Sequence, residues 1–182
     1  MPVRIFISLL LIALPTVFMK QNTQVKAPAV SRLPEVTKTV ERIIGVWKGE
    51  MTANIPGAPP ASFGWTMDCK AVALKAGALC TNGGTASIGE MAESCLLAFD
   101  PEGKAVHYMC VTSMGEVHDH KGKWTDLNSI DFEPLEAGMM GQQVTETLKW
   151  RFDDNGTIDK TSEARLPNGT VMQFRFKGKR TS

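Results

Sequence analysis

The residues best suited to chemistry are two histidines and a glutamate that alternate along one segment. Glu116, His118 and His120 are spaced by two, so they share one face if the segment is a regular strand. Two imidazoles and a carboxylate form a ligand set for a divalent metal such as zinc or copper. The spacing therefore predicts a candidate metal site.

The neighbours of this set disagree about the direction in which it points. Trp124 has the same parity, which favours a set that faces the interior, whereas the opposite parity of Val117 favours the reverse. The simplest interpretation is a pair of solvated histidines on an exposed strand face. A metal- or ligand-binding pair is the first alternative, and a buried pair that is hydrogen-bonded without a ligand is the second.

The register of the histidine segment depends on the turn before it. A two-residue turn at Met114-Gly115 would place Cys110 opposite Asp119, whereas a three-residue turn would place it opposite His118. The sequence leaves both registers open.

The chain has four cysteines, an even number that favours disulfides in an exported protein. No C-x-x-C pair occurs, which argues against a thiolate metal site. A tight turn over 86–89 would place Cys80 opposite Cys95, but it would leave Cys69 and Cys110 on strands that are not adjacent. The alternative joins Cys69 to Cys80 and Cys95 to Cys110 as two diagonal pairs within hairpins. We prefer this alternative because it leaves no cysteine unpaired.

Catalytic and nucleotide-binding patterns are lacking in the sequence. Ser113, His107 and Asp119 have the residue types of a triad, but no G-x-S-x-G motif presents the serine. No phosphate-binding glycine motif opens a helix. The formal net charge of +1 argues against a nucleic-acid partner, which needs a basic surface. We predict no catalytic residue, and the sequence leaves the cofactor unknown.

The elements that must position these residues are mostly short strands. A length of 182 residues suits one domain, and 43% hydrophobic residues exclude a mainly disordered chain. Pro34 is typical of a first helical residue, and Val36, Val40, Ile43 and Ile44 form one helical face. After Gly45 the period becomes alternating. We predict ten strands, near 47–53, 63–70, 78–86, 89–99, 104–113, 116–124, 129–134, 143–152, 157–166 and 170–177.

Hairpin turns link these strands in sequence, which indicates an antiparallel meander. Typical turn residues occur at Asp100-Pro101-Glu102-Gly103, Asp154-Asn155-Gly156 and Pro167-Asn168-Gly169. Ten strands in an open sheet would leave two exposed edges, and closure removes both. The predicted fold is all-β, an up-and-down antiparallel β-barrel of about ten strands with a short N-terminal helix. A β-sandwich is less favoured because it needs long crossings.

Several motifs occur in an order that resembles a known family. Gly45-Val46-Trp47 resembles the G-x-W signature of lipocalins, and it is followed by Lys48-Gly49-Glu50, Phe99-Asp100-Pro101 and Ser113-Met114-Gly115. Together, over about residues 40–178, they resemble a bacterial lipocalin-like family of unknown function with a G-T-W-x-G-E opening, a Y-D-P turn and a D-S-M-G turn. The resemblance implies a calycin-type barrel and supplies no activity. Phe99 and Thr112 depart from the pattern, and the cysteines and histidines lie outside it.

Barrels of this size often enclose a small ligand. We expect Trp47, Trp65, Met67 and Phe99 to line the interior, together with Trp124 if it points inward. The segment 136–141, with two methionines and two glycines, is predicted to be a loop near the barrel mouth. The expected function is to hold a small apolar or amphipathic molecule. The alternatives are a metal- or haem-binding barrel that uses Glu116, His118 and His120, and a structural or interaction module without a ligand.

The first residues have the pattern of an export signal. Arg4 precedes an uncharged run over 5–19, which is shorter than the roughly 20 apolar residues of a membrane-spanning helix. Val25-Lys26-Ala27 offers a cleavage site. We predict a signal peptide over 1–27, a linker over 28–33 and the barrel domain over 34–182. This predicts a periplasmic or extracellular protein with no membrane partner beyond the signal; an uncleaved anchor is the alternative.

Overall fold

The computed structural model describes residues 34–87 and 89–182. The predicted signal peptide and linker lie outside the described residues. One α-helix, α1 (Pro34–Ile43), precedes the strands, and a short 3-10 turn, η1 (Ala73–Lys75), joins the second and third. The strands are β1 (Gly45–Asn54), β2 (Ala61–Val72), β3 (Gly77–Ala86), β4 (Gly89–Asp100), β5 (Ala105–Thr112), β6 (Val117–Trp124), β7 (Ser129–Phe132), β8 (Leu135–Met139), β9 (Gln142–Phe152), β10 (Thr157–Arg165) and β11 (Val171–Arg180).

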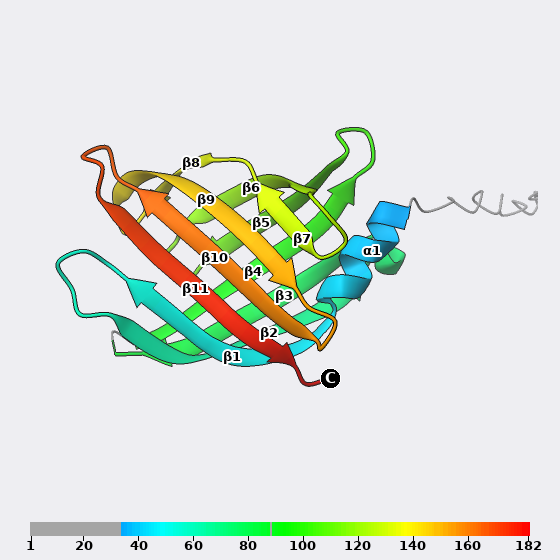
Figure 1. Cartoon of the computed structure of the whole chain (residues 1–182), viewed down its shortest axis with the longest axis horizontal. Coiled ribbons are helices and arrows are strands. Elements are labelled where there is room, and N and C mark those ends of the chain that lie inside the picture. The colour runs from blue at the N-terminus through cyan, green and yellow to red at the C-terminus, as the bar shows by residue number, and fades with distance from the viewer. Residues whose placement is uncertain (1–33, 88) are drawn as a thin grey trace, which may run out of the picture. The chain divides into compact units, whose positions relative to one another are not determined.

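The strands form one closed antiparallel barrel (Figure 1). Strands β1 to β7 pair in sequence order, β9 pairs with β10, and β10 with β11. The pairing of β11 with β1 closes the sheet, from Trp47 opposite Arg180 to Asn54 opposite Gln173. Strands β7 and β8 both pair with β9, at opposite ends of it, so the barrel has ten strand positions. The predicted up-and-down barrel is confirmed.

Strand β8 corrects the prediction of a loop over 136–141. Leu135–Met139 pairs with β9, so the loop shrinks to Met140 and Gly141. Both residues have positive φ, 51° and 75°, as in the primed turns of two-residue hairpins. Without β8, the first half of β9 would present an unpaired edge at the barrel mouth.

Helix α1 lies at one end of the barrel (Figure 1). Its buried face is Val36, Val40 and Ile43, as the helical period predicts. Two indoles fix it there: Trp47 Nε1 donates to Ile43 O at 2.8 Å, and Trp124 Nε1 donates to Thr39 Oγ1 at 2.8 Å. The interior beside the helix is filled by aromatic side chains, including Trp150, Phe152 and Phe132.

Two disulfides connect adjacent strands inside the barrel. They join Cys69 to Cys80 and Cys95 to Cys110, which confirms the preferred pairing. Both pairs are directly opposite rather than diagonal, and Cys80 also lies opposite Cys95 without a bond to it. All four cysteines therefore form one row across β2 to β5.

We predict that the Cys95–Cys110 bridge contributes strongly to stability. It closes a separation of 15 residues, for which the chain-entropy model gives about 3 kcal/mol. The double variant Cys95→Ala/Cys110→Ala should lose about that amount in urea unfolding. The double variant Ser94→Ala/Val111→Ala, at the neighbouring outward-facing pair, is the control. Equal losses in the two variants would contradict the prediction.

Candidate functional site

A cavity of about 710 Å³ occupies the interior at the end away from α1. The loops between β1 and β2, β5 and β6, and β8 and β9 contribute to its rim through Pro59, Met114 and Met140. Its walls combine apolar side chains with a small set of polar ones. The apolar group includes Met51, Phe63, Trp65, Met91, Leu148 and Phe176, and the polar group includes Glu93, Tyr108, His118, His120, Glu146 and Lys160.

Among the five predicted ligand-lining residues, only Trp65 borders this cavity. Trp47 and Met67 are buried in the packed core, and Phe99 and Trp124 pack against it. All four side chains therefore belong to the packed part of the interior beside α1 and not to the cavity wall. Strand parity predicts an inward side chain, but it does not say which end of the barrel is filled.

The two alternating histidines face the interior, so the interpretation as solvated side chains is wrong. His118 is 6% exposed and His120 is 3% exposed, whereas Val117 is 62% exposed on the outer face. Cys110 lies opposite His118, which requires the three-residue turn Ser113–Gly115. Gly115 has a φ of 81°, the left-handed conformation that ends such a turn.

Glu146 on β9 is the carboxylate that joins the histidines. His118 Nδ1 lies 2.7 Å and His120 Nε2 lies 3.4 Å from Glu146 Oε2. His118 Nε2 lies 3.2 Å from the carbonyl of Gly138, and Ser162 Oγ donates to Glu146 Oε1 at 2.5 Å. Because both nitrogens of His118 face oxygen acceptors when Glu146 is ionised, both donate and the imidazole is cationic.

Glu116 is the carboxylate that the sequence spacing grouped with the two histidines. In the structure it belongs to the turn between β5 and β6. Its Oε1 accepts a hydrogen bond from Met140 N at 2.6 Å, and its Oε2 accepts one from Thr112 Oγ1 at 3.3 Å. Glu116 Oε2 lies 3.9 Å from His118 Nε2. It therefore connects the β5–β6 and β8–β9 turns at the rim.

The contact between His118 and Glu146 raises the pKa of the histidine and lowers the pKa of the glutamate. Burial raises the pKa of Glu146, but hydrogen bonds from His118 and His120 outweigh it and hold that pKa well below its ordinary value of 4.5. The hydrogen bond to Glu146 raises the pKa of His118 above 6.5, although burial opposes this shift. The fold therefore stabilises an imidazolium–carboxylate pair.

A second polar group surrounds Lys160, which is 9% exposed. Lys160 Nζ donates to Tyr108 Oη at 3.0 Å and lies 4.8 Å and 4.7 Å from the ring centres of Tyr108 and Trp150. Tyr108 Oη in turn donates to Glu93 Oε1 at 3.3 Å. Burial lowers the pKa of Lys160, and burial together with Glu93 raises that of Tyr108 well above 10.0.

The sequence analysis missed Glu146 and Lys160, although a signal for both exists. Val144, Leu148 and Trp150 share the parity of Glu146 and are buried. Lys160 likewise shares the parity of the buried Ile158 and Ala164. A charged residue within an apolar alternation marks a polar group placed inside the barrel.

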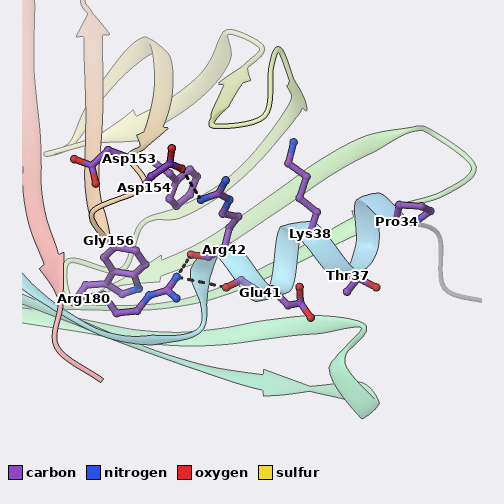
Figure 2. A pocket seen from close by; sticks show the side chains of 11 residues that line it. Pro34, Thr37, Lys38, Glu41, Arg42, Asp153, Asp154, Gly156 and Arg180 are labelled. Atoms are coloured by element: carbon purple, nitrogen blue, oxygen red, sulfur yellow. Dashed lines mark hydrogen bonds and ion pairs between the residues drawn. The ribbon is translucent and has the colours of Figure 1, made fainter.

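A second pocket, of about 560 Å³, lies beside α1 (Figure 2). Several of its charged groups already have partners. Arg180 donates to the carbonyls of Glu41 and Arg42 and stacks on Trp47, and Arg42 lies 4.0 Å from Asp154 (Figure 2). The interior cavity is the stronger candidate site because it combines apolar walls with buried polar groups.

The triad suggested by residue types does not form. His107 Nδ1 lies 3.6 Å from Asp119 Oδ1, but both side chains are on the outer face. Ser113 Oγ instead accepts a hydrogen bond from the backbone N–H of Ala92.

Comparison with solved structures supports the fold. Rv2717c from M. tuberculosis matches with a TM-score of 0.62 and 15% identity, over 83% of this chain and 100% of that chain. The S-type phycobiliprotein lyase CPES from Guillardia theta matches with a TM-score of 0.52 and 10% identity, over 79% and 90%. No protein-family model and no curated protein matches the sequence. The closed antiparallel barrel and the likeness of fold to these neighbours fit a lipocalin-like barrel.

We predict that the His118–Glu146 pair makes stability depend on pH. The lowered pKa of Glu146 stabilises the fold above pH 4.5, and this contribution is lost as pH falls below that value. The raised pKa of His118 stabilises it below pH 6.5, and this contribution is lost as pH rises above that value. The pair therefore contributes fully between these two values.

In urea unfolding with a chelator present, Glu146→Gln should lower the free energy of unfolding by about 3 kcal/mol between pH 4.5 and pH 6.5, and by less outside this range. Glu90→Gln, at an exposed glutamate, is the matched control. A loss that does not vary with pH would contradict the assignment.

Proposed function

We propose that this protein is an exported barrel that holds a small apolar or amphipathic molecule in its interior cavity. The observation that carries the proposal is the hollow half of the barrel, about 710 Å³ with largely apolar walls. Ligand cavities in proteins commonly measure about 300–1,000 Å³ and combine apolar walls with a few polar groups.

The distribution of the lining favours an amphipathic ligand. The rim carries exposed apolar side chains, among them Met114 and Met140, which are 48% and 44% exposed. The polar groups are on the strands, where Tyr108, His120, Glu146 and Lys160 lie within the barrel wall. We infer that the ligand enters with its polar end first and leaves its apolar end among the rim methionines.

Export is supported by the two disulfides. Such bridges are typical of an oxidising periplasmic or extracellular compartment. Among the described residues, no helix is sufficiently long and apolar to span a membrane. We propose that residues 1–27 act as the signal peptide.

We also propose membership of the bacterial lipocalin-like family of unknown function. The ordered motifs at Gly45-Val46-Trp47, Phe99-Asp100-Pro101 and Ser113-Met114-Gly115 support it. The likeness to the two solved structures is a likeness of fold and does not identify the ligand.

The ligand prediction is tested with dansyl-labelled undecanoic acid, an amphipathic fluorescent probe. Ala53 is 9% exposed, points inward and lines the cavity, whereas Thr52 beside it points outward. Filling the cavity with Ala53→Trp should weaken probe binding about tenfold or more, because tenfold corresponds to only about 1.4 kcal/mol of lost contact. Thr52→Trp should bind as the wild type does.

Circular dichroism checks that both variants are folded. If Ala53→Trp does not fold, Met91→Trp fills the same cavity from β4. Equal binding by folded inward and outward variants would reject the cavity as the binding site. Failure of the wild type to bind the probe, with no co-purified molecule in its native mass spectrum, would reject the function.

A further inference from the structure

We propose that His118, His120 and Glu146 bind a divalent transition-metal ion of the zinc class at the wall of the cavity. Each residue offers one ligand atom, and these atoms lie within 4.8 Å of one another. All three side chains are buried and border the cavity. The metal site lies in the wall of the same cavity as the proposed apolar ligand, but the inference does not depend on that ligand.

The observed separations suit a single ion. Zinc–nitrogen and zinc–oxygen bonds measure about 2.0–2.2 Å, so two ligand atoms of a tetrahedral ion lie about 3.4 Å apart. Glu146 Oε2 lies 3.4 Å from His120 Nε2 and 2.7 Å from His118 Nδ1. The His118–Glu146 separation would have to widen by about 0.7 Å to reach the tetrahedral value when an ion takes the place of the proton between them.

The surrounding contacts orient the ligands. The carbonyl of Gly138 lies 3.2 Å from His118 Nε2, so Nε2–H donates to it, and Nδ1 would ligate the ion after releasing to solvent the proton that it shares with Glu146 in the metal-free pair. Ser162 Oγ holds Glu146 Oε1, which leaves Oε2 directed to the histidines. His120 Nδ1 is buried and has no hydrogen-bond partner among the described residues. No hydrogen bond at Nδ1 therefore competes with an orientation in which Nε2 faces the ion.

The ligand types indicate which ions bind. Two imidazoles and one carboxylate are borderline ligands that suit zinc, whereas calcium and magnesium prefer oxygen alone. Three protein ligands leave a further coordination position on a tetrahedral ion. Because the three residues line the cavity, water or a donor atom of an occupant would supply the fourth ligand from that side.

Two competing groups of ligands are excluded by their contacts. Glu93, Cys95 and Cys110 also converge, but both sulfurs are in a disulfide and do not act as thiolates. Glu116, the carboxylate of the sequence-based set, is held at the rim by Met140 N and Thr112. The structure thus keeps both predicted histidines and replaces Glu116 with Glu146.

Zinc titration of the chelator-treated full chain by calorimetry tests the proposal. The wild type should bind one ion, and Glu146→Gln should weaken binding about tenfold or more. Glu116→Gln is the matched control and should bind as the wild type does. Cobalt substitution adds a spectroscopic signature, since tetrahedral cobalt with nitrogen and oxygen ligands gives a visible absorption that Glu146→Gln should lose.

Two further variants keep the test decisive. If Glu146→Gln does not fold, Ser162→Ala removes only the group that positions Glu146 and should weaken zinc binding by a smaller factor. His107→Ala removes the histidine on the outer face and should leave binding unchanged.

Absence of zinc binding by the wild type, or its loss in Glu116→Gln or His107→Ala with retention in Glu146→Gln, would overturn the proposal. The dansyl probe, measured in the presence of chelator, reports the cavity separately. A chain that binds the probe but not zinc would reject the metal site alone. A chain that binds zinc but not the probe, and that carries no co-purified molecule in its native mass spectrum, would reject the proposed ligand function alone.

Discussion

The pairing of β1 with β11 is the contact on which the rest of the structure depends. It joins the first strand to the last along eight opposed residue pairs and leaves the sheet without its two long edges. Closure also gives every strand an inside and an outside, so the alternation of side chains becomes an alternation between a shared interior and solvent. A charged residue of inward parity must then be satisfied by other residues that face the same interior.

The two ends of this interior differ because helix α1 covers only one of them. Trp47 and Trp124 anchor the helix through their indole N–H groups, and Trp150, Phe152 and Phe132 fill the space beneath it. The opposite end has no such cover, and its rim consists of hairpin loops. The interior is therefore packed at one end and hollow at the other, with the histidine–glutamate and lysine–tyrosine groups in the walls of the hollow end.

The disulfides and the histidine–glutamate group lie next to each other inside the barrel. The row of half-cystines across β2 to β5 continues into β6 at His118, which lies opposite Cys110. The two bridges cross-link β2 to β3 and β4 to β5, next to the strand that carries the histidines, while Glu146 reaches the histidines from β9. Burial of these ionisable groups costs free energy, which the short contacts among His118, Glu146 and Ser162 offset.

The sequence determined the strands except β8, most of the turns, the helical face of α1 and the barrel itself, because alternation and turn chemistry are local properties. It also favoured the observed disulfides, since adjacent strands are implied by the hairpins. It did not decide the face of β6, where Trp124 and Val117 gave opposite indications, or the partner of the histidines. Glu146 meets them because β6 and β9 both pair with the short strand β7, a neighbourhood in the sheet that local alternation does not predict. For the same reason, only the tertiary structure decided that Trp65 lines the cavity while Trp47 and Met67 belong to the packed end.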